Sequence, residues 1–153
     1  MPVRNCREKV CFGEAFPEKF NVTEAKKFPH NGFTNPRSVD ENLSYLYEWE
    51  EYYKGNIVDF DYHLMWDHIL DAGGECIAKV IHTDIRNLKN LGMNGFISCQ
   101  LQRNSFPTSI AMTVLGKTLW NNDTNFEEVR RDLYTASFGA DMADTMGEYF
   151  ATL

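Results

Sequence analysis

Two aspartates and a histidine occupy alternate positions in a stretch that is otherwise mostly apolar or aromatic. Asn56 to Met65 reads as a β-strand, and Asp59, Asp61 and His63 fall on one of its faces because side chains alternate along a strand. Charged groups in a buried strand need a polar cavity or dedicated partners. The pattern therefore predicts a site on this strand.

Two further interpretations of the same triplet stay open. All three side chains are ligand types that suit a divalent metal ion, and Asp67 and His68 follow closely. However, three polar residues on a single strand match no established ligand pattern, so we predict neither a metal nor another cofactor. In a purely structural role, Asp59 and Asp61 would instead be hydrogen-bonded to groups such as Arg103.

The elements that must position these residues form a strand–helix–strand unit. Residues 75–91 carry apolar side chains at helical spacing and end at Gly92, and Gly95 to Gln102 reads as a second strand. Asp84 stands beside Ile85 in the apolar stripe of the helix. Two strands joined by such a crossover are parallel, and parallel strands are normally buried on both faces. The sequence therefore predicts an α/β fold.

Composition excludes several classes of function. The 153 residues are 43% hydrophobic, which is typical of one globular domain, and the net charge of −7 argues against a nucleic-acid partner. No apolar run approaches the roughly 20 residues that span a bilayer. The first residues have no apolar leader region, so we expect a cytoplasmic location. Cys76 and Cys99 lie inside the predicted helix and second strand and are expected to be buried free thiols.

The chain divides into three parts. Residues 1–37 form an irregular lead-in with a possible short strand, 38–121 hold the βα units, and 122–153 form a helical extension.

Four more helices are expected. They begin near Ser38 or Asp40, at Pro107 (ending at Trp120), near Asn125 (ending at Gly139) and at Ala140. The helix that ends at Trp120 is apolar on most sides and should be well buried.

Several weak motifs occur in an order that resembles a known family. They are Phe60-Asp61-Tyr62-His63, the run Asp84 to Gly95 with its D-x-R-x-L-x-x-x-G and G-x-x-G patterns, Leu119-Trp120, Phe138-Gly139 and Glu148-Tyr149. Together they resemble the end of the barrel in a bacterial domain-of-unknown-function family related to alpha-glucuronidases and other glycoside hydrolases. The resemblance covers about Trp49 to the C-terminus.

The resemblance implies the last two or three βα units of a TIM-barrel-like domain. A whole (β/α)₈ barrel takes about 250 residues, so the chain would be a fragment, inactive alone, with an open barrel edge that invites self-association. The implied activity is hydrolysis of glycosidic bonds in carbohydrate, with uronic acids among the candidate sugars. A non-catalytic carbohydrate-binding or interaction module is the alternative, and a metal-assisted hydrolase is a third.

Site residues follow from the rule that barrel enzymes work at the C-terminal ends of their strands. Asp61 is the predicted catalytic base or sugar-binding acid, and its partner lies either outside this chain or at Glu14. The other predicted substrate-binding residues are His63, Trp66, Gln100, Gln102, Arg103 and Tyr62. Arg103 would suit the carboxylate of a uronic acid through a two-bond fork. Trp66 is the preferred sugar-stacking residue, whereas Trp120 is expected in the core.

Overall fold

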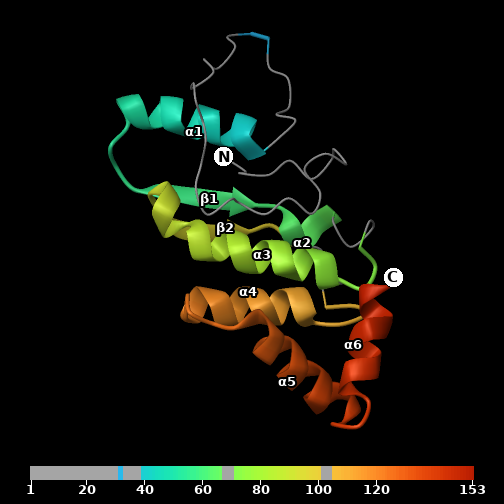
Figure 1. The fold of residues 1–153 in the computed structure, drawn as a ribbon. Helices are drawn as coiled ribbons and strands as arrows, with labels where there is room; N and C mark the ends of the chain where they lie inside the picture. Colours follow the sequence, from blue (N-terminus) through green and yellow to red (C-terminus); the bar gives the residue numbers. More distant parts are fainter. Residues whose placement is uncertain (1–30, 33–38, 67–70, 101–104) are drawn as a thin grey trace.

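A computed structural model describes residues 31–32, 39–66, 71–100 and 105–153, without the side chain of Trp66. The elements are α1 (Val39–Tyr52), β1 (Ile57–Asp61), α2 (His63–Trp66), α3 (Glu75–Asn87), the 3₁₀ turn η2 (Lys89–Leu91), β2 (Met93–Ser98), α4 (Ile110–Trp120), α5 (Phe126–Phe138) and α6 (Ala143–Ala151) (Figure 1). The predicted lead-in lies outside the described residues except for Asn31 and Gly32.

The predicted crossover is present and the α/β class is confirmed. β1 and β2 pair in parallel, with Asp59 opposite Phe96 and Asp61 opposite Ser98, and α3 connects them. The described residues contain only this two-stranded sheet, so the structure does not extend to a barrel.

The first strand is shorter than predicted. Its extension to Met65 is wrong, because the backbone N–H of His63 donates a hydrogen bond to the Asp61 carboxylate, 2.9 Å away. A hydrogen bond from a backbone N–H to the side chain of an aspartate two residues earlier forms an Asx turn, and this turn ends the strand. Met65 N–H then bonds to the Tyr62 carbonyl, and α2 begins at His63. The second strand starts two residues earlier than predicted, at Met93, and ends at Ser98.

Local signals placed several helix ends correctly. Gly92 and Gly139 take positive φ angles of 70° and 86° where the preceding helical segments end, a conformation that favours glycine. The Asn125 side chain accepts hydrogen bonds from the backbone N–H groups of Glu127 and Glu128 and so caps α5.

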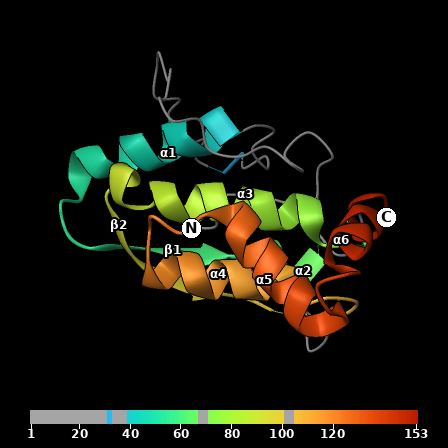
Figure 2. The same ribbon diagram turned by 60° about the horizontal axis from the view of Figure 1, so that its bottom comes forward.

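The main core lies around α3, which contacts helices on two sides (Figure 2). Its buried face includes Ile77, Ile81 and Ile85, all members of the predicted stripe. Leu43 of α1 and Val114 of α4 belong to the same apolar cluster and are fully buried. α5 packs on α4, and α6 packs beside α5 around a smaller cluster that includes Tyr134 and Phe150.

Three predictions about burial and helix position are wrong. Trp120 is 93% exposed although it was expected in the core, and Cys76 is exposed on α3. α4 starts at Ile110, so Pro107 precedes the helix instead of occupying its first turn. Because α4 is apolar on nearly every side, its sequence pattern does not identify which side faces solvent.

The face of the sheet turned away from the aspartates is unusual for parallel strands. Val58, Phe60 and Ile97 are 44%, 36% and 53% exposed there, and Phe60 lies opposite Ile97 in the strand register. We call these three residues the outer sheet face. Parallel sheets usually bury both faces. The outer sheet face is therefore an apolar surface that this chain leaves accessible to solvent.

Candidate functional site

The aspartates of β1 point to the protected side of the sheet. Asp59 and Asp61 are 3% and 4% exposed, whereas Val58 and Phe60, which alternate with them along the strand, are open to solvent. This alternation follows from the strand geometry, so the sequence placed the two carboxyl groups correctly on one face. Only the assignment of His63 to the same strand was wrong.

A buried cluster forms where β1 ends. One oxygen of the Asp61 carboxylate accepts the backbone N–H of His63, and the other pairs with Nδ1 of the His63 ring. On the opposite side of the ring, Nε2 lies 3.1 Å from Oδ2 of Asp84 on α3. All three side chains are at least 94% buried. We refer to Asp61, His63 and Asp84 as the His63 cluster.

The two carboxylates keep the imidazole charged. Burial alone would lower the pKa of His63, but the charge and hydrogen bond of Asp61, followed by those of Asp84, outweigh burial and raise the pKa to about 10. His63 is therefore an imidazolium at neutral pH, and each ring N–H donates to one carboxylate. In that state the ring has no lone pair with which to accept a proton or bind a metal.

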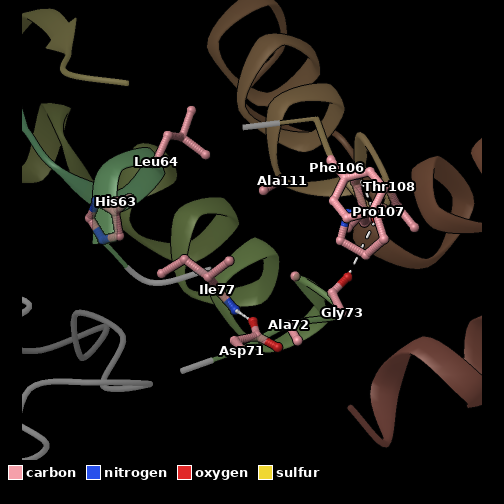
Figure 3. Close-up of a pocket in the computed structure, with 12 residues that line it drawn as sticks. His63, Leu64, Asp71, Ala72, Gly73, Ile77, Phe106, Pro107, Thr108 and Ala111 are labelled. Atoms are coloured by element: carbon pink, nitrogen blue, oxygen red, sulfur yellow. Dashed lines mark hydrogen bonds between the residues drawn. The ribbon is translucent and has the colours of Figure 1, made fainter. Parts of the chain in front are cut away.

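A small hollow adjoins His63 (Figure 3). His63, Leu64 and Ile77 lie along it together with residues of the 71–74 and 106–111 segments. Its volume of about 20 Å³ accommodates about one water molecule, whereas ligand pockets measure about 300–1,000 Å³. The hollow cannot hold a sugar ring.

Polar groups around the hollow are already used by the fold. The Asp71 carboxylate accepts the backbone N–H of Ile77 at 2.6 Å, which satisfies a donor in the first turn of α3. The Thr108 hydroxyl lies 3.4 Å from the Gly73 carbonyl oxygen (Figure 3).

Among the other predicted binding residues, Gln100 and Tyr62 are described with their side chains, and neither lines the hollow beside His63. Gln100 is exposed beyond the end of β2 and does not line the hollow. The ring of Tyr62 packs edge-on against Phe60, at 5.2 Å between ring centroids, and Phe60 belongs to the outer sheet face. Trp66 is the last residue of α2. Glu14, Gln102 and Arg103 lie outside the described residues, so their roles stay predictions.

Sequence reasoning missed Asp84 as a site residue. The available signal was an acid placed on the apolar stripe of an amphipathic helix, where a charge needs a partner. Glu75, at the start of α3, is a second buried acid that needs a partner. Both of its oxygens accept hydrogen bonds from Arg130 Nε, at 2.9 and 3.0 Å, and one accepts the Tyr134 hydroxyl at 2.6 Å.

The cluster of Glu75, Arg130 and Tyr134 joins α3 to α5. Burial and the hydrogen bond to Glu75 raise the pKa of Tyr134, so its hydroxyl stays protonated and donates to the carboxylate. Every charged or polar group in the cluster has a partner within it. We therefore assign this cluster a structural role.

Comparison with known proteins adds no family assignment. No family model matches the sequence, and no curated protein or solved structure is significantly similar to it. Within the described part of the chain, no three His, Cys, Asp or Glu side chains are arranged to hold a metal ion. The helices in those same ranges are too short or too polar to cross a membrane.

Proposed function

We propose that this chain supplies the last βα units of a (β/α)₈-barrel, glycoside hydrolase-like protein that acts on carbohydrate, and that it does not cleave glycosidic bonds alone. The observation that carries the proposal is the His63 cluster at the C-terminal end of β1, beside a parallel neighbour strand. Barrel enzymes place their functional groups at that end of their strands.

The outer sheet face supports the barrel part of the proposal. Val58, Phe60 and Ile97 would be buried if further parallel strands closed the sheet on that side. In such a barrel Asp61 is the candidate base or sugar-binding acid, with a second carboxyl group such as Glu14 completing the pair, and this role requires the Asp61 carboxylate to turn away from His63. The resemblance of the motifs from Phe60 to Tyr149 points to the same class of protein.

The burial of the His63 cluster supports the absence of turnover. A catalytic acid or base must come within hydrogen-bond distance of the sugar. Asp61 uses both carboxylate oxygens on His63, and the adjoining hollow has room for about one water molecule. A substrate therefore has no access to Asp61 in this chain.

A panel of aryl glycosides and aryl glucuronides tests this proposal, with wild type and Asp61→Asn measured side by side. We expect no turnover from either protein. Turnover by wild type that Asp61→Asn abolishes would contradict the proposed inactivity and would make Asp61 catalytic in the chain as it stands. Glu48→Gln on α1, which lies outside the His63 cluster, is the control for a change of one carboxyl group.

The genomic DNA upstream of Met1 tests the barrel. An in-frame continuation that encodes about five more βα units is expected. A stop codon directly upstream, with no such units, would contradict the barrel.

A second candidate is a non-catalytic carbohydrate-binding or interaction module. The specific observation in its favour is that His63, Asp61 and Asp84 bond to one another and that all three are buried, so the cluster exposes no reactive group of its own. Sugar binding that is the same in wild type and Asp61→Asn, without turnover and without an upstream continuation, would identify this module.

The metal-assisted alternative requires a free ring nitrogen, and both nitrogens of His63 face carboxylates. Metal analysis of the purified protein tests this alternative. A bound ion that is lost in His63→Ala would support it.

A further inference from the structure

An open groove runs between α4 and α5, on a different part of the molecule from the His63 cluster. These two helices pack against each other, and both views show them as neighbours (Figures 1 and 2). The groove has a volume of about 560 Å³, within the range of about 300–1,000 Å³ that is typical of ligand sites. The side chains along it include Trp120, Asn121, Asp123, Asn125, Glu128 and Asp132.

Trp120 gives the groove an unoccupied aromatic surface. It is the last residue of α4, and 93% of it is exposed, so its packing within the chain is minimal. A large aromatic side chain in that position contributes almost nothing to folding, because burial is what makes aromatic residues stabilising. Its ring is instead available to stack on a flat apolar face of a ligand, such as the C–H face of a pyranose ring.

Two asparagines present hydrogen-bond donors beside this ring. The Asn121 oxygen accepts the backbone N–H of Asp123, and the Asn125 oxygen accepts those of Glu127 and Glu128. These bonds fix both amide groups. Within the described ranges, neither side-chain nitrogen donates to another group, so each retains two N–H donors for a ligand.

Carboxylates in the groove supply hydrogen-bond acceptors and determine which ligand charges the groove tolerates. Asp123, Glu128 and Asp132 line the groove, and none of them forms an ion pair with a described residue. Lys117 is the single basic residue among the groove-lining residues, against three acids. A groove with this excess of negative charge repels anionic ligands and accepts hydrogen bonds from hydroxyl groups.

We propose that the α4–α5 groove is a binding site for neutral oligosaccharides, with Trp120 as the stacking surface and the carboxylate and amide groups as hydroxyl partners. This site is separate from the His63 cluster and does not depend on a barrel or on hydrolysis. It also differs from a uronic-acid site, because its charge disfavours a carboxylate-bearing sugar.

NMR titration of the ¹⁵N-labelled full chain tests the proposal. The probes are the neutral hexasaccharides of xylan, cellulose, mannan and starch, with oligogalacturonate as the anionic comparison. We expect at least one neutral probe to shift the indole N–H signal of Trp120, which Trp120→Phe identifies. Trp120→Ala should weaken that binding about tenfold or more, a loss typical of a removed stacking contact.

Trp49→Ala is the matched control, because Trp49 is 62% exposed on α1 and lies outside the groove. It should leave binding unchanged. Asp132→Asn should also weaken binding of the neutral probe. Trp120→Ala and Asp132→Asn should both keep the wild-type unfolding midpoint. The proposal is overturned by no binding of any neutral probe up to about 10 mM, by equal affinity of wild type and Trp120→Ala, or by stronger binding of oligogalacturonate. Trp120-dependent self-association without sugar binding would overturn it too, in favour of a protein interface.

Discussion

The two ring nitrogens of His63 face carboxylates from different elements, Asp61 at the end of β1 and Asp84 on α3. This imidazolium is therefore the link between a strand end and its crossover helix. Removing one member of a buried ion cluster costs more than the cluster contributes, because the remaining charges keep their burial but lose their partner. Substitutions of His63 are therefore expected to change the free energy of unfolding.

His63→Gln is predicted to lower the free energy of unfolding by about 3–5 kcal/mol at pH 7, because two buried carboxylates lose the cation that they share. Urea denaturation measures this change. His82→Gln is the matched control: His82 is half-buried and bonds to the Thr124 carbonyl oxygen, so about 1 kcal/mol is expected. Equal effects of the two substitutions would contradict the role of the His63 cluster.

The stabilisation from His63 should also depend on pH. Its pKa is raised from 6.5 in the unfolded chain to about 10 in the folded protein, so the contribution is fully present below about pH 6.5 and is lost as pH rises through about 10. The difference in unfolding free energy between wild type and His63→Gln should therefore shrink between pH 6.5 and pH 10. A difference that grows over this window would show that the folded-state pKa is not raised.

At the scale of elements, local signals were the reliable part of the sequence. Gly92, Gly139 and Asn125 act through their own backbone or side chain, so the sequence alone located those helix ends. The end of β1 was missed because strand propensity continues to Met65, while a single hydrogen bond from His63 N–H to Asp61 stops the strand. Asp84 was missed because its partner is 21 residues away and no spacing rule connects the two.

The backbone just before α3 also packs closely against the backbone of α6. A Cβ atom added at Gly73 would lie 1.8 Å from the carbonyl oxygen of Phe150, near the end of α6. Gly73→Ala is predicted to displace α6 and to destabilise the protein by about 2 kcal/mol or more, since backbone cannot move aside as a side chain can.

Gly116→Ala is the control for Gly73→Ala. Gly116 lies in α4, and apart from its chain neighbours and the adjacent helix backbone no atom lies within 4 Å of the added carbon, so the change should stabilise by up to about 1 kcal/mol. Thermal unfolding of both variants, with backbone NMR shifts of α6, measures the contrast. Unchanged α6 signals in Gly73→Ala would contradict the predicted close contact.

For the molecule as a whole, the exposed outer sheet face is the feature that most needs an explanation. An apolar sheet surface whose outer strand edges pair with no other described strand favours association with other strands. In the proposed barrel those strands belong to the same protein. In this chain alone, a second copy is the available partner.

The isolated chain is therefore predicted to self-associate as its concentration rises, and Ile97→Lys should reduce that association. Sedimentation velocity at several concentrations measures it. Leu119→Lys is the matched control, because Leu119 is 48% exposed on α4, away from the sheet, against 53% for Ile97. If association falls equally in Ile97→Lys and Leu119→Lys, the outer sheet face is not its cause.

The charge state of His63 tests the central claim most directly, because the proposed site rests on an imidazolium held between Asp61 and Asp84. We would follow the ring ¹⁵N signals from pH 5 to about pH 11 and assign His63 by the signals that His63→Gln removes. The structure predicts that both ring nitrogens stay protonated at pH 8 and lose a proton only near pH 10. A neutral His63 ring at pH 8 would contradict it.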